Sequence, residues 1–391
     1  MNTNFLRRFR EIFILGAVFL TAPFFYFRLY LKKAFLKNKP SKRILIIDNA
    51  KIGDLICATP VFRAIKEKYA DSYLAVLAVP RVEEILQNNQ NINELIIFPL
   101  NSSLSFKKTW ELFKKIKSED FNVCINLVPG TLNFILPFLA GIPIRITSAN
   151  SEMGFFYKKL SFLSNRKLVY QKNSLSVKHY LGLLEFIGVK NSNLTKEVFT
   201  DDLSQNKVAD FLAQQKIKSS DIIVGLSLSA GNKIKEWGAN NFAKLADEII
   251  KKYSFKIVAI GSPADELVLK DFQRLVKENV IITYKDFSLK ELPSLIKRFN
   301  YFISVDTGPL FIANALGVPV VDIVGPFNYV EQAPYYEKCE IVKPENIDCW
   351  PCLHIWSSSV LDCQFGHYQC LKKTTPEMVL RALEALIRRC H

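Results

Sequence analysis

Short apolar runs alternate with segments of helical periodicity along most of the chain. In the first half, the runs that predict buried strands are Arg43–Ile47, Leu74–Val79, Glu94–Phe98, Asn122–Asn126 and Ile144–Thr147. Helical segments lie between them, and the first is predicted near Leu55–Tyr69. Because strands and helices alternate, we expect a parallel sheet covered by helices on both faces.

The same alternation starts again at Ile222. The predicted strands are Ile222–Ser227, Lys256–Ile260, Val280–Thr283, Tyr301–Val305 and Val318–Val324. The predicted helices lie near Asn241–Tyr253, Asp265–Lys277, Leu289–Arg298 and Leu310–Leu316. An α/β chain with two Rossmann-like, doubly wound domains is therefore expected. Ligands of such sheets bind at the carboxyl ends of the strands, so the two domains should face one cleft.

The remaining segments set the expected domain limits. One helix is predicted at His179–Ile187, an inter-domain linker at Thr195–Lys207, and an amphipathic helix from Thr375-Pro376 to about Arg389. We expect a membrane-associating segment at 1–40, Rossmann-like domains at 41–200 and 201–345, and a cysteine-containing tail with the terminal helix at 346–391.

Residues 1–40 combine an apolar stretch with basic flanks. The sixteen residues Ile12–Phe27 carry no charge, and arginines and lysines stand on both sides. A spanning helix needs about 20 residues, and Pro23 interrupts this stretch, so a segment lying on an anionic leaflet is favoured over a single span. No small-residue cleavage site follows, which argues against a signal peptide. The alternative is an apolar helix packed on its own domain.

Composition and charge narrow the choice of partner. The chain has 391 residues, 49% apolar content and a formal net charge of +15, which is typical of a globular protein with an anionic partner. No basic run interleaved with aromatics resembles a nucleic-acid module, so nucleic acid is not expected. The expected anionic partner is therefore an acidic membrane surface or a phosphorylated substrate.

Three turns at the ends of predicted strands carry the candidate chemistry. After Tyr301–Val305, Asp306 and Thr307 are expected to cap the next helix, while Gly308 and the helix amides form an anion site. Asp306 serving only as a cap is the alternative.

The other two turns follow the first strand of each half. In the loop 229–238, Gly231 allows close backbone approach, and Lys233 and Lys235 offer charge to a phosphate, although loop lysines are usually only solvated. In the first half, Gly53 and Asp54 stand at the start of a helix, where an acid can also simply favour the helix dipole. No G-x-G-x-x-G follows that strand, and no Asp-x-Asp pair predicts a metal-dependent site.

Four cysteines, Cys349, Cys352, Cys363 and Cys370, gather near the end of the chain. A C-x-x-C with two further cysteines is a weak pattern for a zinc site. Thiols that stiffen a loop, or a redox-dependent bridge, are the alternatives.

Taken together, these motifs resemble glycosyltransferase family nine, the heptosyltransferases of the lipopolysaccharide inner core. The resemblance lies in RILIIDNAKIGDLICATPVFRAIKEKY at 43–69, SAGNKIKEWGANNFAKLA at 229–246 and SVDTGPLFIANALGVPVVDIVGP at 304–326. It implies a GT-B fold, with an acceptor domain at 41–200 and a nucleotide-sugar domain at 201–345. It also implies an inverting transfer from a nucleotide-diphosphate sugar such as ADP-heptose to a lipid-linked glycan. It further implies that the protein acts at the cytoplasmic face of the inner membrane, bound peripherally or through an N-terminal anchor.

The resemblance also assigns roles to residues. The general base falls on Asp54, and the donor phosphates fall to Lys235 and to Asp306-Thr307-Gly308, with Gly53, Gly231 and Asn232 in the same donor-binding set. Family members commonly have His three residues after that last glycine of the turn, and here the position is Phe311. A sugar-nucleotide epimerase of the same fold and an inactive envelope binding protein are the alternatives.

Overall fold

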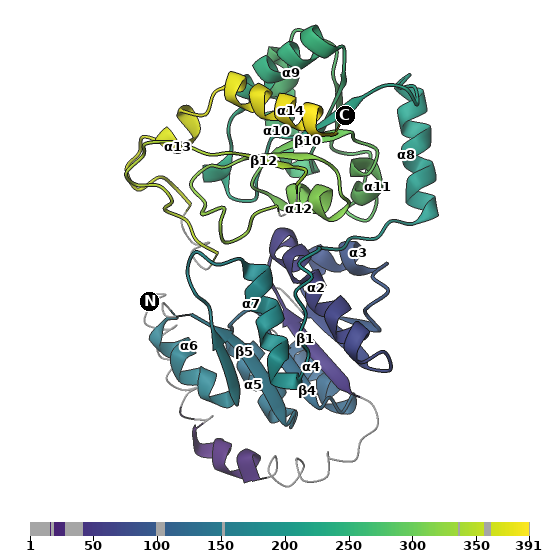
Figure 1. The fold of residues 1–391 in the computed structure, drawn as a ribbon. Coiled ribbons are helices and arrows are strands. Elements are labelled where there is room, and N and C mark those ends of the chain that lie inside the picture. Colours follow the sequence, from purple (N-terminus) through teal and green to yellow (C-terminus); the bar gives the residue numbers. More distant parts are fainter. Residues whose placement is uncertain are drawn as a thin grey trace.

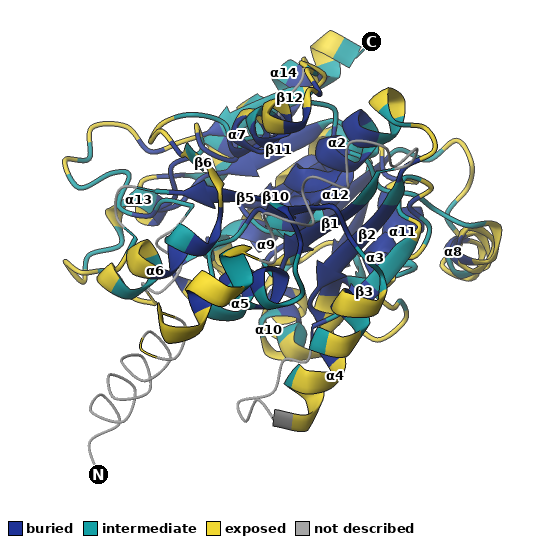
Figure 2. Ribbon diagram, turned by 90° about the horizontal axis from the view of Figure 1, so that it is seen from below, coloured by how far each residue is buried: buried dark blue, intermediate teal, exposed yellow. Residues whose placement is uncertain are grey.

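The structure is a computed structural model with two lobes, one above the other (Figure 1). It describes residues 16, 19–27, 42–98, 106–150, 153–334, 337–355 and 361–390. Each lobe is built on one parallel sheet, and Figure 2 shows the central strands of both sheets as buried.

The N-terminal lobe holds a six-stranded parallel sheet in the order β3-β2-β1-β4-β5-β6. Its strands are β1 (Arg43–Asp48), β2 (Tyr73–Ala78), β3 (Glu94–Ile97), β4 (Val123–Asn126), β5 (Ile144–Ala149) and β6 (Arg166–Val169). Its helices are α2 (Ile52–Lys68), α3 (Glu83–Leu86), α4 (Phe106–Ser118), α5 (Thr131–Leu139), α6 (Phe155–Leu160) and α7 (Ser176–Gly182). The five predicted strands are confirmed. The pattern missed β6, because Arg166 and Lys167 make this edge strand polar and exposed.

The C-terminal lobe repeats the plan, with the strand order β12-β11-β10-β7-β8-β9. Its strands are β7 (Ile223–Ser227), β8 (Lys256–Ile260), β9 (Ile281–Thr283), β10 (Tyr301–Val305), β11 (Val320–Ile323) and β12 (Cys339–Val342). Its helices are α8 (Asp202–Gln214), α9 (Ala239–Tyr253), α10 (Glu266–Leu275), α11 (Leu292–Ile296), α12 (Gly308–Ala315), α13 (Gln369–Lys372) and α14 (Pro376–Cys390). The sequence did not predict β12, which is a short strand at the edge of the sheet.

The strand order places the loops that carry the candidate chemistry. In the N-terminal sheet, β1 lies beside β4, and in the C-terminal sheet β7 lies beside β10. At these two neighbouring pairs the order of the strands reverses, which is where ligands of open parallel sheets bind. The turns after β1, β7 and β10 therefore open at the binding edges of their sheets.

The two lobes meet through the first turns of α2 and α12. A Cβ atom built on Gly53 would lie 2.9 Å from Phe311 Cδ2, and one built on Gly308 would lie 3.1 Å from Ile52 Cβ. Real Cβ atoms essentially never approach to 2.9 Å, so a side chain at Gly53 would displace Phe311, and one at Gly308 would press tightly on Ile52. Leu55 of α2 and Leu310 of α12 belong to one continuous apolar core.

The connection between the lobes differs from the prediction. Residues 189–201 have no regular structure, but α8 begins at Asp202, so the second half of the expected linker Thr195–Lys207 is helical. The reason is a side-chain cap: the carboxylate of Asp201 accepts a hydrogen bond from the Ser204 amide at 2.9 Å.

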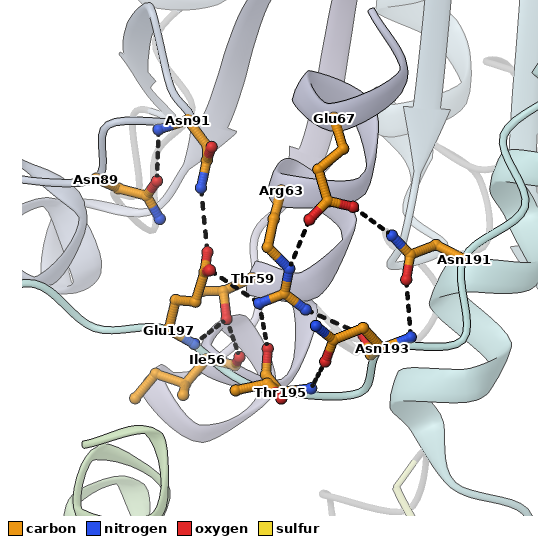
Figure 3. A network of polar contacts seen from close by, with 10 residues as sticks. All are labelled: Ile56, Thr59, Arg63, Glu67, Asn89, Asn91, Asn191, Asn193, Thr195 and Glu197. Carbon is orange, nitrogen blue, oxygen red and sulfur yellow. Dashed lines mark hydrogen bonds and ion pairs between the residues drawn. The ribbon is translucent and has the colours of Figure 1, made fainter. Parts of the chain in front are cut away.

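Figure 3 shows how the connection is fastened to the N-terminal lobe. Arg63 of α2 donates to the Thr195 carbonyl and to Glu197 Oε1, both at 2.8 Å, and to the Asn193 carbonyl at 3.0 Å. The Glu197 amide donates to Thr59 Oγ1 at 2.8 Å. Charge-assisted bonds of this kind hold the extended chain against the same helix that carries Asp54.

The N-terminal segment is described only in part. Residues 19–27 form a helix whose inner side, with Ala22, Phe25 and Tyr26, packs on the N-terminal lobe, and Tyr26 Oη donates to the Phe162 carbonyl at 2.7 Å. Among the residues that the structure describes, none of the helices is both long and apolar enough to cross a membrane. The basic flanks of the predicted membrane segment lie outside the described residues.

Candidate functional site

A cleft of about 670 Å³, including the open space at its mouth, lies between the lobes at the carboxyl ends of both sheets. All eight residues predicted for the base and the donor site line it: Gly53, Asp54, Gly231, Asn232, Lys235, Asp306, Thr307 and Gly308. The folding pattern thus brings together residues up to about 250 positions apart in the sequence.

Asp54 lies in the first turn of α2, facing the cleft. Its Oδ1 accepts a hydrogen bond from Gln332 Nε2 at 2.8 Å, and its Oδ2 accepts from the Lys51 amide at 3.4 Å. Burial raises the pKa of Asp54, while the Gln332 bond and the charge of Lys235 act in the opposite direction. A carboxylate of raised basicity, held on the cleft wall by a neutral amide, is suited to accept a proton.

Lys235 and Asp306 form an ion pair on the opposite wall. Lys235 Nζ lies 2.5 Å from Asp306 Oδ2, and the two side chains are 18% and 6% exposed. The lysine also lies over the ring of Phe327, with 4.3 Å between Nζ and the ring centroid. These contacts fix the ammonium group at the cleft.

The expected capping of α12 is wrong. Asp306 is engaged with Lys235, and Thr307 stands at the N-cap position but makes no side-chain capping bond. The reason is that the Lys235 side chain extends to Asp306, and the buried carboxylate pairs with this ammonium group instead of capping the helix. The amino end of α12 at Gly308 is thus left to face the cleft, which is the arrangement that binds anions.

The two lysines of the loop after β7 have different surroundings. Lys233 pairs with Glu236 at 2.7 Å, is 68% exposed, and does not line the cleft. Glu236 also accepts a hydrogen bond from the Ala230 amide at 3.2 Å. Lys233 therefore stabilises the loop, and Lys235 is the lysine of this loop that faces a ligand.

Phe311 supplies no polar group to the cleft that it helps to line. Its side chain is 2% exposed and packs against Gly53, and the ammonium of the buried Lys196 lies 5.7 Å from the ring centroid. The ring therefore contributes only apolar surface at this position.

Sequence patterns missed part of the cleft wall. Phe327 and Gln332 come from the connection between β11 and β12, and Leu353, His354 and Ile355 come from the cysteine-containing tail. These residues lie in irregular segments without a recognisable motif. The only available signal was His354, which stands among the four clustered cysteines.

The cysteine cluster gives no support to the weak zinc prediction. Cys349, Cys352, Cys363 and Cys370 are free thiols. Across the described ranges, no group of three His, Cys, Asp or Glu side chains is placed to hold a metal ion. The tail is instead joined to the C-terminal lobe by its backbone, because the amides of Cys352 and Leu353 donate to the Pro326 carbonyl at 3.1 and 3.0 Å.

Comparisons with known proteins agree with this architecture. The family model for glycosyltransferase family 9 (heptosyltransferase) matches residues 109–360. Lipooligosaccharide heptosyltransferase 2 of Campylobacter jejuni is 22% identical over 338 residues, which cover 86% of this chain and 96% of the relative. Lipopolysaccharide heptosyltransferase 2 of Escherichia coli is 23% identical, with 88% of this chain and 98% of the relative covered.

The fold comparison gives the same result. A family 9 glycosyltransferase structure from Veillonella parvula superposes with a TM-score of 0.79 at 22% identity, covering 89% of this chain and 98% of that one. The predicted α/β fold with two parallel sheets, of the GT-B kind, is confirmed.

Proposed function

The chain belongs to glycosyltransferase family 9, and on that premise we propose that it moves heptose from ADP-heptose to a lipopolysaccharide core or a related envelope glycan, with inversion at the transferred carbon. The family makes it a glycosyltransferase. The names of the relatives support heptose as the transferred sugar and an envelope glycan as the acceptor, and the cleft supports the inverting transfer.

One observation carries the proposal: a single cleft joins a carboxylate from one lobe to a cation and a helix amino end from the other. Asp54 comes from the N-terminal lobe, and Lys235 and Gly308 come from the C-terminal lobe. An inverting transfer requires both, because the acceptor hydroxyl must lose a proton while the departing diphosphate gains charge.

In the proposed reaction, the acceptor oxygen attacks the anomeric carbon of the donor on the face opposite to the diphosphate. Asp54 takes the proton of the hydroxyl, a new carbon–oxygen bond forms, and the old bond to the phosphate oxygen breaks with its electron pair leaving on ADP. Lys235 and the amides at the start of α12 stabilise that negative charge. The nucleotide sugar is a co-substrate, and no further cofactor is proposed.

Calorimetric titration with a panel of nucleotide sugars tests the donor. We expect ADP-heptose to bind more tightly than UDP-, GDP- and CMP-linked sugars. The structure of heptosyltransferase II from Escherichia coli, which this fold resembles, is named for ADP-heptose, and this supports the order. Tighter binding of another nucleotide sugar would overturn the donor assignment while leaving the family intact.

Gly231 provides a test of where the donor lies. A Cβ atom built on Gly231 meets nothing within 4 Å, so the protein itself has room for a side chain there. We expect Gly231→Ala to change the free energy of unfolding by less than about 0.5 kcal/mol but to weaken ADP binding about tenfold, because the methyl group enters the donor space. Gly154→Ala is the matched control, since that position is also open but lies outside the cleft. Equal ADP affinity in both variants would contradict the placement.

We also propose that the protein acts peripherally at the cytoplasmic face of the inner membrane, and the helix at residues 19–27 supports the membrane contact. Its outer side carries Leu20, Phe24 and Phe27, which are 85%, 67% and 65% exposed. Their spacing of four and three residues places them on one face, opposite to the side that packs on the lobe. Such an apolar face is suited to lie in a lipid surface, where a lipid-linked acceptor would be found.

We therefore expect the triple change Leu20→Ser, Phe24→Ser and Phe27→Ser to lower the fraction of protein bound to phosphatidylglycerol vesicles at least tenfold. The reason is that the variant has three fewer apolar side chains to bury in the lipid. Leu203→Ser with Leu267→Ser is the control, because these leucines are 79% and 80% exposed on the other lobe. Vesicle sedimentation measures both. Equal binding of the two variants would remove this helix from membrane contact.

A further inference from the structure

Gln332 reaches the candidate base from the C-terminal lobe. Its Nε2 donates to Asp54 Oδ1 at 2.8 Å, and its side chain lies on the cleft wall, where it is 8% exposed. A carboxylate that is held by one oxygen keeps its other oxygen in a fixed direction, and a base must point at the hydroxyl whose proton it takes. The position of Gln332 therefore bears directly on the proposed transfer.

Gln332 belongs to an irregular segment, residues 328–333, and the residue before it is fixed to the N-terminal lobe. This residue is Glu331, whose side chain is completely buried. Its Oε1 accepts a hydrogen bond from the Asn173 amide at 3.2 Å, and its carbonyl accepts from the Ser176 amide at 2.8 Å. Its Oε2 accepts from the Ile355 amide at 2.9 Å. Glu331 is thus joined to the same lobe that carries the base.

The residue after Gln332 is held by Lys196, which comes from the connection between the lobes. Lys196 Nζ donates to the Ala333 carbonyl at 3.2 Å and to Asn314 Oδ1 of α12 at 2.8 Å, and the side chain is 1% exposed. A buried amine requires such partners. Both bonds need only an N–H group, so they form whether the amine is charged or neutral.

We propose that Lys196 and Glu331 are positioning residues for the transfer, which fix the segment 328–333 so that Gln332 holds Asp54 Oδ1. This inference rests on the proposed function, because it takes Asp54 as the base. Neither Lys196 nor Glu331 lines the cleft. No bond is made or broken at these two residues, and they act on the base only through Gln332.

The test is a double-variant cycle on the rate of heptose transfer, at a pH high enough that Asp54 is deprotonated. Gln332→Leu should lower kcat about tenfold, because the base loses its orientation. Lys196→Met removes both bonds of the amine and should lower kcat by a similar factor. Combined with Gln332→Leu, it should lower kcat less than about twofold further, because the two changes break the same link.

The donor KM provides a second measurement. Since the segment is proposed to orient the base, the KM for ADP-heptose should stay within about threefold of the unmodified protein in all three variants. The melting temperature of each variant is recorded beside the rates. If Lys196→Met does not fold, Glu331→Gln takes its place in the cycle, because its amide group turns N–H bonds toward the backbone amides that Glu331 accepts from.

Lys66→Met is the matched control. Lys66 Nζ also donates to one backbone carbonyl and one asparagine side chain, that of Ser72 at 2.5 Å and that of Asn93 at 2.7 Å. It lies in the last turn of α2, at the end of the helix away from Asp54, and does not line the cleft. Its kcat should equal that of the unmodified protein.

The outcomes separate this inference from the proposed function. If the unmodified protein transfers heptose and Gln332→Leu leaves kcat unchanged, the inference is overturned and the function stands. If the losses in the two single variants multiply in the double variant, Lys196 is only structural, and the inference is overturned as well. A raised donor KM at unchanged kcat would also overturn it, because the segment would then serve donor binding. If the unmodified protein transfers no heptose, the proposed function and the inference are overturned together.

Discussion

Replacing Asp54 with Asn is expected to lower turnover by about 10²–10⁴-fold, with donor affinity nearly unchanged. The change keeps the shape of the side chain and the oxygen that accepts from Gln332, but an amide cannot take the proton of the acceptor. Steady-state rates and calorimetric donor affinity on the same variant measure both quantities. Near-normal turnover would remove Asp54 from the mechanism.

Asp202→Asn is the control for this change, because Asp202 is likewise an acid in the first turn of a helix but lies outside the cleft. An acid that serves only the helix dipole contributes about 0.3–1 kcal/mol to stability and nothing to the rate. If Asp54 were such an acid, the two variants would behave alike in turnover and in melting temperature.

The raised pKa of Asp54 also fixes the direction of the pH dependence. The protonated carboxyl group cannot act as a base, so the rate should fall as the pH falls through the raised pKa. Removing the Gln332 bond takes away an influence that lowers this pKa, so Gln332→Leu should move the acidic limb of the rate profile to higher pH. This shift is measured with saturating donor.

The second large effect is expected at Lys235. Lys235→Ala should weaken ADP binding by about 1.5–3 kcal/mol, because the phosphates lose a charge-assisted partner. The change also leaves Asp306, which is 6% exposed, without its cation. A carboxylate so placed repels a diphosphate, and the loss in the single variant therefore contains two contributions.

The double variant Lys235→Ala with Asp306→Asn separates these contributions, since it removes both charges. We expect it to recover part of the ADP affinity but to stay weaker than the unmodified protein. Lys233→Ala is the control, because that lysine pairs with Glu236 outside the cleft. Calorimetry measures the ADP affinity of each variant. If the Lys235 and Lys233 variants both bound ADP as tightly as the unmodified protein, this result would contradict the donor site.

The central strands and their turns were predictable from sequence for a physical reason. Strands covered on both faces, such as β1 and β10, are apolar along most of their length, and polar residues gather in the turns at their carboxyl ends. The edge strands β6 and β12 were missed because that constraint is weaker at an edge. The start of α8 was missed because its signal is one capping aspartate, Asp201, within a polar stretch.

The candidate site was predictable only where a residue sits in such a turn. Asp54 and Lys235 follow directly from the strand pattern and the resemblance, whereas Gln332 and His354 reach the cleft from irregular segments whose path depends on tertiary contacts. Gly53 illustrates a different limit. The sequence showed that a glycine mattered there, but the structure shows that its small size serves the contact with Phe311 of the other lobe.

A transfer assay tests the central claim most directly. The purified protein is incubated with ADP-heptose and a lipopolysaccharide acceptor that lacks outer heptose, and mass spectrometry follows the acceptor, the sugar nucleotide and ADP. We predict that the acceptor gains heptose in step with the release of ADP, and that Asp54→Asn abolishes this gain over the same interval. A changed sugar nucleotide with an unmodified acceptor would indicate an epimerase, and no change in any component would indicate a binding protein; either result would contradict the proposed transfer.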